Sequence, residues 1–310
     1  MRTTFGKKGF TKSSVISSYV CHQCRMNTSS HMLFISHPLN IRLYASSSSE
    51  QNTRDQHLLV LDRLARATVA VVGIGGVGSW AAEALCRSGV GNIILIDLDD
   101  ICISNTNRQV HAVSTSVGKR KIDEMKTRLL HINPHCNITT ILDFVSTENV
   151  DGIIESIAPE LAVCLDAIDG KIEKAALIAA CATRQVPIVT VGGSAGKMDP
   201  TKIIFDDLAR AKEDRLLFAC RKILRQEYGF KKANLRNPTR PAKKWNIIAV
   251  HSTERIKYVP DDEVNNGSSF RICDSSLGTA CHVTGTFGFV AASRIVDMIA
   301  KDNLMKPTAM

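Results

Sequence analysis

A glycine-rich turn between an apolar run and an amphipathic segment constrains the fold of this chain more than any other feature. The apolar run covers residues 68–72, and the turn contains Gly73, Gly75, Gly76 and Gly78. Glycines at such a turn let the backbone approach a phosphate, and the helix that follows offers free N–H groups. Asp97 ends a second apolar run 19 residues after Gly78, where a nucleotide-binding βαβ unit places the carboxylate that holds a ribose.

Strand and helix patterns alternate along the chain from residue 58. Short β-branched runs predict strands at 68–73, 92–97, 137–143, 162–166 and 187–192. Longer segments between them predict helices at 77–88, 117–132 and 171–184. Such alternation is typical of an α/β fold. We therefore predict a Rossmann-like, mostly parallel sheet with helices on both of its faces.

The pattern changes after residue 200. We predict a charged helix at about 208–228, short strands around 247–250 and 255–259, and a terminal helix within 279–300. The terminal segment is the most apolar part of this region, but it contains His282, Arg294 and Asp297. Ionisable residues are rare in segments that cross a membrane, so we expect this helix to pack against the domain.

A polar loop after the second strand separates this chain from ordinary dinucleotide-binding proteins. It reads Asn105-Thr-Asn-Arg108-Gln109, and an arginine in this position is not part of the dinucleotide fingerprint. Further motifs follow at 118–121 and 165–169. Together these motifs resemble the ubiquitin-activating-enzyme-like adenylyltransferases, the ThiF/MoeB/HesA superfamily. A finer resemblance, to its tRNA threonylcarbamoyladenosine dehydratases, is carried by the segments 72–85, 105–111, 166–169, 190–196, 252–254 and 284–290.

The resemblance implies a role for each residue of the motifs. The glycines would cradle the phosphates of ATP, Asp97 would hold the ribose, and Asp99 is a weaker candidate for that role. Arginine and lysine engage phosphate as a bidentate donor and as a point charge, respectively. The residues implied to contact the nucleotide and its triphosphate are Asn105, Arg108 and Lys121, and the implied Mg²⁺ ligand is Asp169. Cys273 matches a cysteine of the family and is a possible thiol near the substrate, although an inert cysteine is as plausible.

The implied activity is an ATP-dependent dehydration of tRNA. The substrate carboxylate belongs to a threonylcarbamoyl group on an adenosine of the anticodon loop, and its activation by adenylation leads to ring closure. One alternative is adenylation of the C-terminus of a ubiquitin-like or sulfur-carrier protein, and the absence of a zinc site made by two CxxC pairs weighs against it. A second alternative is an NAD-dependent oxidoreductase with the same class of fold.

Charge is distributed unevenly along the chain, whose formal net charge is +9. Residues 1–44 contain six Lys or Arg and no Asp or Glu, a composition typical of an organellar transit peptide. We therefore expect targeting to the mitochondrial matrix, with plastid or cytoplasm as alternatives. We divide the chain into this presequence, a polar linker at 45–57 and an adenylation domain at 58–310.

A second basic region lies inside the domain, in the helix-loop segment 208–257. Its part from 210 to 257 contains 14 Lys or Arg against four acids, which favours contact with the phosphates of tRNA. Tyr228, Phe230 and Trp245 lie in the same segment, and we expect them to stack on an unpaired base.

The segment before the first strand departs from the pattern of this family. Members of this family carry an N-terminal helix with an arginine that reaches ATP across a homodimer interface. Residues 46–67 show no clear version of that helix, and Arg54 is the one candidate for the arginine. A homodimer remains the expected assembly.

Overall fold

The structure, a computed structural model, describes residues 50–231, 244–255 and 278–308, with side chains from residue 57 onward. The first strand and helices are α1 (Glu50–Arg66), β1 (Thr68–Val72) and α2 (Gly78–Arg87). They are followed by β2 (Asn92–Ile96), α3 (Lys121–Ile132), β3 (Asn137–Ile141), α4 (Val150–Ile157), β4 (Val163–Asp166), α5 (Lys171–Thr183) and β5 (Ile188–Val191). The last elements are β6 (Ile203–Asp207), α6 (Arg215–Glu227), β7 (Ile248–Ser252) and α7 (Cys281–Ala300).

The strands form one seven-stranded sheet in the order β3-β2-β1-β4-β5-β7-β6. All neighbouring pairs are parallel except β6 with β7, which run antiparallel at one edge. The register places Val72 beside Ile96 on one side and Asp166 on the other. The carboxyl ends of β1, β2 and β4 therefore meet at one edge of the sheet, which is where folds of this class bind ligands.

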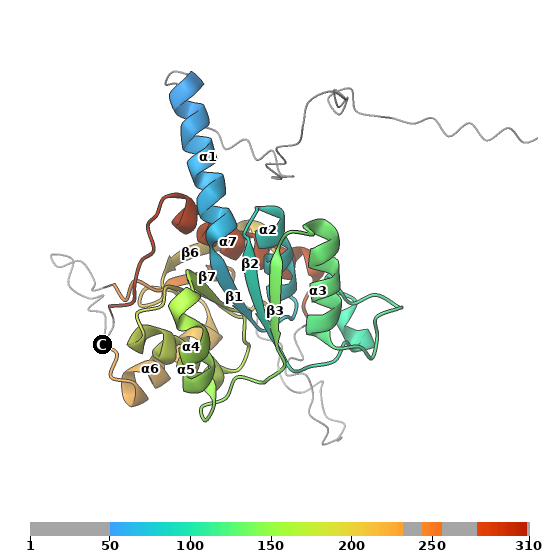
Figure 1. Cartoon of the computed structure of the whole chain (residues 1–310). Helices are drawn as coiled ribbons and strands as arrows, with labels where there is room; N and C mark the ends of the chain where they lie inside the picture. The colour runs from blue at the N-terminus through green and yellow to red at the C-terminus, as the bar shows by residue number, and fades with distance from the viewer. Residues whose placement is uncertain (1–49, 232–243, 256–277, 309–310) are drawn as a thin grey trace, which may run out of the picture. The chain divides into compact units, whose positions relative to one another are not determined.

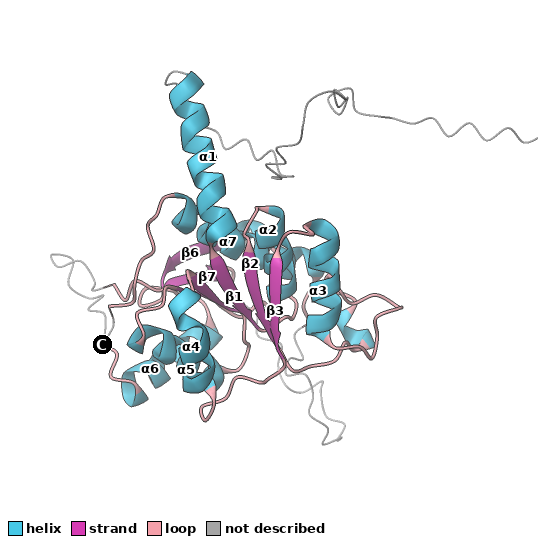
Figure 2. Cartoon of the chain, in the orientation of Figure 1, coloured by secondary structure: helices cyan, strands magenta, loops and turns pink. Residues whose placement is uncertain are grey.

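Helices cover both faces of the sheet (Figures 1 and 2). Along β1, Val69 and Val71 pack with α2, α3 and α7 on one face, whereas Ala70 and Val72 pack with α4, α5 and α6 on the other. Successive side chains of a strand point to opposite faces, so a strand buried on both sides reads as a continuous apolar run. The predicted α/β fold with a mostly parallel sheet is confirmed.

Helix α1 differs from the expected linker and supplies the helix that the sequence did not show clearly. It begins at Glu50, so residues 50–57 are helical, and Arg54 lies within it. Leu64 is buried against the core, and the Arg63 Nη1 donates a hydrogen bond of 2.7 Å to the carbonyl oxygen of Ala300. These contacts with the C-terminal helix stabilise a segment whose first half has no apolar stripe of its own.

Two predicted helices begin later than expected. Helix α3 begins at Lys121, because Gly118 has a positive φ of 85° and Arg120 bridges to Asp100. Helix α6 begins at Arg215, where the Asp214 Oδ1 accepts a hydrogen bond of 2.8 Å from the Leu217 N–H. An aspartate that satisfies a free N–H group of the first turn fixes the start of a helix. The strand expected at 255–259 lies almost entirely outside the described residues.

Helix α7 is the only described helix that is long and apolar enough to cross a membrane. Its residues Val283, Phe287, Ala291 and Ile295 are all buried in the core that it shares with α2. This agrees with the expected packed helix.

A buried ion pair lies beneath the edge where β1 and β4 end. The Asp166 Oδ2 accepts hydrogen bonds from the Lys174 Nζ at 2.7 Å and from the Thr190 Oγ1 at 2.6 Å. Both charged side chains are completely buried. The Asp166 Oδ1 also accepts from the Ile168 N–H at 3.1 Å, so the pair anchors the start of the loop after β4.

Replacing Lys174 with Met should strongly destabilise the protein. The substitution leaves the Asp166 carboxylate buried without its cation, and breaking such a pair costs roughly 3–5 kcal/mol. Urea unfolding followed by circular dichroism measures the change. The matched variant Lys171→Met, at an exposed position of the same helix, should change stability by less than about 0.5 kcal/mol. Equal stability of the two variants would show that the buried Asp166 carboxylate does not depend on its cation.

Candidate active site

The glycine turn lies where the carboxyl ends of β1, β2 and β4 meet. The Gly73 N–H donates to the Ile96 carbonyl oxygen at 2.9 Å, and Gly73 has a φ of 87°. A Cβ on Gly73 would lie 3.0 Å from the carbonyl oxygen of Ala167 in the loop after β4. Only glycine combines this left-handed backbone with so close an approach of another chain segment.

Gly78 begins α2 directly above this turn. A Cβ at Gly78 would overlap the Gly73 carbonyl oxygen, so the helix can begin this close to the turn only without a side chain there. No side chain caps the N-terminus of α2. The Ser79 N–H of the first turn donates to the Gly75 carbonyl oxygen at 3.1 Å, so this helix start offers an anion the positive end of its dipole, as a phosphate cradle requires.

Asp97 follows the last residue of β2 and clamps the glycine turn. Its Oδ2 accepts a hydrogen bond of 2.6 Å from the Ile74 N–H, and its Oδ1 accepts one of 2.8 Å from the Asp99 N–H. Burial raises the pKa of this carboxyl, whereas the charge of Lys121 and the two backbone hydrogen bonds act in the opposite direction. Asp97 thus lies beside the turn, as the ribose role requires, and also holds the turn in place.

Lys121 and Asp99 form an ion pair next to Asp97. The Lys121 Nζ lies 2.6 Å from the Asp99 Oδ2, with the lysine side chain buried and the aspartate largely exposed. The Lys121 N–H also donates to the Asp99 carbonyl oxygen at 3.1 Å. The sequence predicted that Lys121 contacts the triphosphate. In this structure, Asp99 fixes the position of that cation at the first residue of α3.

Asn105 shapes the polar loop that carries Arg108. Its side-chain Oδ1 accepts a hydrogen bond of 3.0 Å from the Cys102 N–H, and its carbonyl oxygen accepts from the N–H groups of Arg108 and Gln109. The Asn105 side chain is buried. The structure therefore shows that Asn105 holds the loop in shape, a role additional to its predicted contact with the nucleotide.

Arg108 lies directly against the glycine turn. A Cβ built on Gly76 would be 3.2 Å from the Arg108 Cγ and Cδ, so the arginine stem covers this glycine. Its Nη1 donates to the Ser104 carbonyl oxygen at 2.8 Å and to the Asn107 Oδ1 at 3.0 Å. The Trp80 Nε1, on α2, donates to the Arg108 carbonyl oxygen at 2.9 Å. The stem of Arg108 therefore contacts one of the glycines that were predicted to bind phosphate.

Asp169 and Asp166 take different places, although both belong to one motif. Strand β4 ends at Asp166, and Asp169 is exposed in the loop that follows. The predicted end of this strand at residue 166 is confirmed, and Asp166 turns inward to pair with Lys174. The Asp169 carboxylate makes no hydrogen bond or ion pair within the described part of the chain. Asp169 lies two residues after Ala167, whose carbonyl oxygen approaches Gly73, and its carboxylate is a hard oxygen donor of the kind that suits Mg²⁺.

The remaining sequence predictions have mixed outcomes. Cys273 lies outside the described residues. The expected stacking of Phe230 and Trp245 on a base is wrong, because both rings are buried and pack edge to face with centroids 5.0 Å apart. The Trp245 Nε1 donates to the Lys231 carbonyl oxygen at 2.9 Å, which satisfies the indole inside the core. Tyr228 is half-buried.

Two residues beside the site carry polar atoms that sequence reasoning did not single out. Gln109 and His111 are buried, and within the described residues the Gln109 Oε1 and both ring nitrogens of His111 have no hydrogen-bond partner. The Gln109 amide nitrogen lies 3.9 Å from a Cβ built on Gly75. Burial lowers the pKa of His111 to about 4, and the charges of Lys121 and Arg128 act in the same direction. Their positions after Arg108 in the loop motif are the only signal that the sequence offers.

His111 should make the protein less stable in mild acid. The unfolded chain binds a proton near the ordinary histidine pKa of about 6.5, whereas the folded chain binds it only near 4. Stability contributed by the neutral ring is thus complete above pH 7 and is lost as the pH falls towards 4. Lowering the pH from 7.5 to 5 should cost wild type about 1–2 kcal/mol more than His111→Gln in urea unfolding. The surface variant His135→Gln should behave like wild type, and identical pH profiles for all three proteins would contradict this assignment.

Comparison with known proteins agrees with this geometry. The ThiF family matches residues 48–309. The tRNA threonylcarbamoyladenosine dehydratase of Haemophilus influenzae is 41% identical over 241 residues, which cover 78% of this chain and 88% of that protein. The corresponding Escherichia coli protein is 42% identical over 249 residues, with 78% and 89% covered.

Solved structures give the same result at the level of the fold. The E. coli dehydratase TcdA in complex with ATP superposes with a TM-score of 0.67 at 38% identity, covering 82% of this chain and 97% of that structure. Its complex with AMP gives the same TM-score and identity, with 83% and 99% covered. These matches, over almost the whole length of the relatives, place the chain in the ThiF family, in the group of the tRNA threonylcarbamoyladenosine dehydratases.

Proposed function

We propose that this protein is an ATP-dependent dehydratase that activates the carboxylate of N6-threonylcarbamoyladenosine in tRNA and closes it into a ring. The observation that carries the proposal is the assembly around the glycine turn. Arg108 covers Gly76, Lys121 is held beside Asp97, and Asp169 is exposed in the loop that touches Gly73. The similar E. coli dehydratase binds ATP, as its solved complex states.

The chemistry needs positioned charge more than an enzyme nucleophile. An oxygen of the substrate carboxylate attacks the α-phosphorus of ATP, and the bond to pyrophosphate breaks. A nitrogen of the threonylcarbamoyl group then attacks the activated carbonyl carbon, and AMP leaves with the former carboxylate oxygen. The ring product has lost one water overall. Arg108 and Lys121 would stabilise the charge that develops on the departing pyrophosphate.

A divalent cation would assist the first step. Asp169 would hold Mg²⁺, which commonly binds through one or two carboxylates and the phosphate oxygens of a nucleotide. Among the described residues, no group of three or more His, Cys, Asp or Glu side chains forms a metal site. A site completed by the nucleotide itself therefore fits these residues better than a cage made by the protein alone.

The N-terminal part of the chain supports a proposed assembly and a proposed location. We place the protein in the mitochondrial matrix because residues 1–44 are basic and contain no acid. A homodimer is supported by α1, which extends past the other helices in Figure 1 and leaves Leu58 and Leu59 at least half exposed. Imaging of a residues 1–44 fusion tests the location, and sedimentation velocity tests the dimer. A cytosolic fusion or a monomer at micromolar concentration would exclude the respective proposal.

The decisive experiment supplies the purified protein with ATP, Mg²⁺ and tRNA that carries N6-threonylcarbamoyladenosine. Mass spectrometry of the digested nucleosides should show a product lighter by one water, formed only with ATP. Adenylation of a ubiquitin-like protein, with no change in tRNA, would favour the sulfur-carrier alternative. Binding of NAD without any response to ATP would favour an oxidoreductase.

In the same assay, Asp169→Asn and Arg108→Gln should each lower turnover at least tenfold while the circular dichroism spectrum stays unchanged. Each removes a charged contact to phosphate, and one hydrogen bond to a charged group contributes roughly 1.5–3 kcal/mol. Asp143→Asn, a partly exposed acid after β3, is the matched control and should retain most of the activity. Near-normal turnover of either site variant would remove that residue from the proposed machinery.

A further inference from the structure

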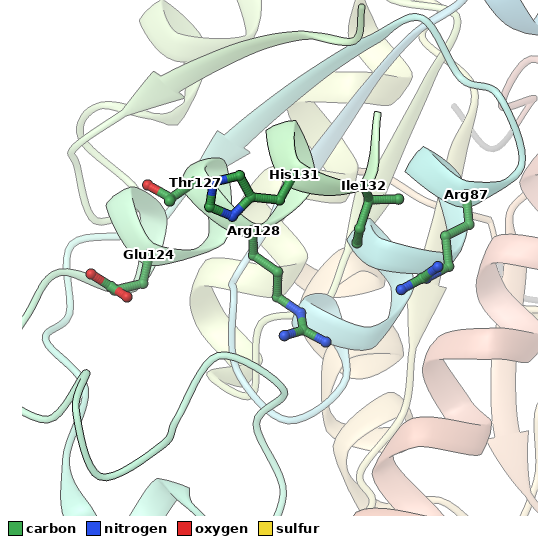
Figure 3. A pocket seen from close by; sticks show the side chains of 6 residues that line it. All are labelled: Arg87, Glu124, Thr127, Arg128, His131 and Ile132. Carbon is green, nitrogen blue, oxygen red and sulfur yellow. The ribbon is translucent and has the colours of Figure 1, made fainter. Parts of the chain in front are cut away.

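A shallow pocket of about 360 Å³ lies on the outer surface of α2 and α3, apart from the glycine turn. Arg87 from the last turn of α2 borders one side, and the other lining residues come from α3 (Figure 3). These are Glu124, Thr127, Arg128, His131 and Ile132. The proposed chemistry uses none of these side chains.

One buried carboxylate fixes both arginines. The Glu83 Oε1 accepts a hydrogen bond of 2.8 Å from the Arg87 Nε, and its Oε2 accepts one of 2.6 Å from the Arg128 Nε. Burial would raise the pKa of Glu83, but the hydrogen bonds and charges of the two arginines outweigh it and hold this pKa below its ordinary value. Glu83 therefore remains ionised and fixes both guanidinium groups before any ligand arrives.

The outer ends of these guanidinium groups are available for binding. Each arginine uses its Nε for Glu83, and within the described residues neither donates a hydrogen bond from its Nη atoms. The side chains of Arg87 and Arg128 are 57% and 40% exposed. The charge of Glu124 is balanced by Lys119, whose Nζ lies 2.9 Å from the Glu124 Oε1. Two positive arginines then face one negative carboxylate, that of Glu83. The pocket therefore has a net positive charge. Planar donors held at a fixed orientation suit the oxygens of a phosphate.

The distance between the pocket and the proposed ATP site can be spanned by a few nucleotides. Lys121 begins α3 beside Asp97, and His131 lies ten residues further along the same helix. A helix rises about 1.5 Å per residue, so these positions are about 15 Å apart along its axis. A nucleic-acid strand in a duplex advances about 3.4 Å per nucleotide, so a phosphate four or five nucleotides from the reacting base can reach the pocket.

We propose that the pocket between Arg87 and Arg128 binds a backbone phosphate of the substrate tRNA, away from the base that reacts. This inference rests on the proposed tRNA-modifying function and gives it a docking point outside the basic segment 208–257. Arg87 and Arg128 donate their outer N–H groups to the phosphate oxygens, and Glu83 positions both side chains. A phosphate contact of this kind supplies affinity and register without reading sequence.

The test adds a carboxylate to the pocket without disturbing Glu83. His131 is exposed, and in His131→Glu the new side chain lies one turn from Arg128 and competes for its guanidinium group. We expect tRNA binding about three- to tenfold weaker near 0.1 M salt, with the slope of log K against log salt smaller by about 0.7–0.9, the value for one lost phosphate contact. The matched control is Ser156→Glu, an equal charge change at an exposed position of α4 on the other face of the sheet, which should bind like wild type.

A second variant removes the arginines without leaving a buried charge. Glu83→Gln, Arg87→Gln and Arg128→Gln combined should lose the same salt-slope increment, provided that circular dichroism shows a folded protein. Wild-type affinity and slope in His131→Glu would overturn the docking site even if the triple variant fails to fold. Equal weakening by Ser156→Glu would also overturn it, because the effect would then be general repulsion.

Competition separates the two sources of phosphate. Inorganic phosphate at millimolar concentration should not displace tRNA from wild type, and displacement that is lost in His131→Glu would reassign the pocket to a free anion. If wild type converts tRNA and the pocket variants bind tRNA with the affinity and salt slope of wild type, the docking site alone fails. If wild type neither binds nor converts tRNA, the proposed function and the docking site fail together.

Discussion

The close approach of two backbone segments at the carboxyl edge of the sheet is the constraint on which the site depends. Gly73 has a left-handed backbone with the loop after β4 against it, and Gly78 begins α2 where a side chain would overlap the Gly73 carbonyl oxygen. Asp97 fixes the same turn through the Ile74 N–H. Because the turn is this tight, it brings the N-terminus of α2 and the stem of Arg108 close together. Both can then contact the phosphates of one nucleotide.

The buried pair beneath this edge connects the core to the site. Asp166 receives three hydrogen bonds, from Lys174, Thr190 and Ile168, so β4, α5 and β5 all fix the start of the loop that carries Asp169. A fully buried ion pair is expensive to remove from water and gives little net stability. Its geometry here fixes where the chain leaves β4 and enters the loop that carries Asp169.

The two faces of the sheet have different relations to a large substrate. The basic segment 208–257 includes α6 on one face, whereas the arginines held by Glu83 lie on the other face with α2 and α3. A tRNA molecule is large enough to contact surfaces well away from the reacting base. A site at the edge between both faces leaves each of them accessible to such a substrate.

The sequence alone predicted the central strands of a mostly parallel sheet, the glycine turn and the residues around it, because the motifs are local and parallel strands buried on both faces are continuously apolar. Helix α1 and the edge strand β6 required the tertiary structure. The former is held by Leu64 and Arg63 against the C-terminal part of the chain, and the latter exists only through its pairing with β7. The burial of Trp245 and the inward turn of Asp166 likewise depend on contacts with other elements of the fold. Periodicity identifies a strand or a turn from neighbouring residues, but the partner that buries or pairs a side chain is selected only when the whole chain has folded.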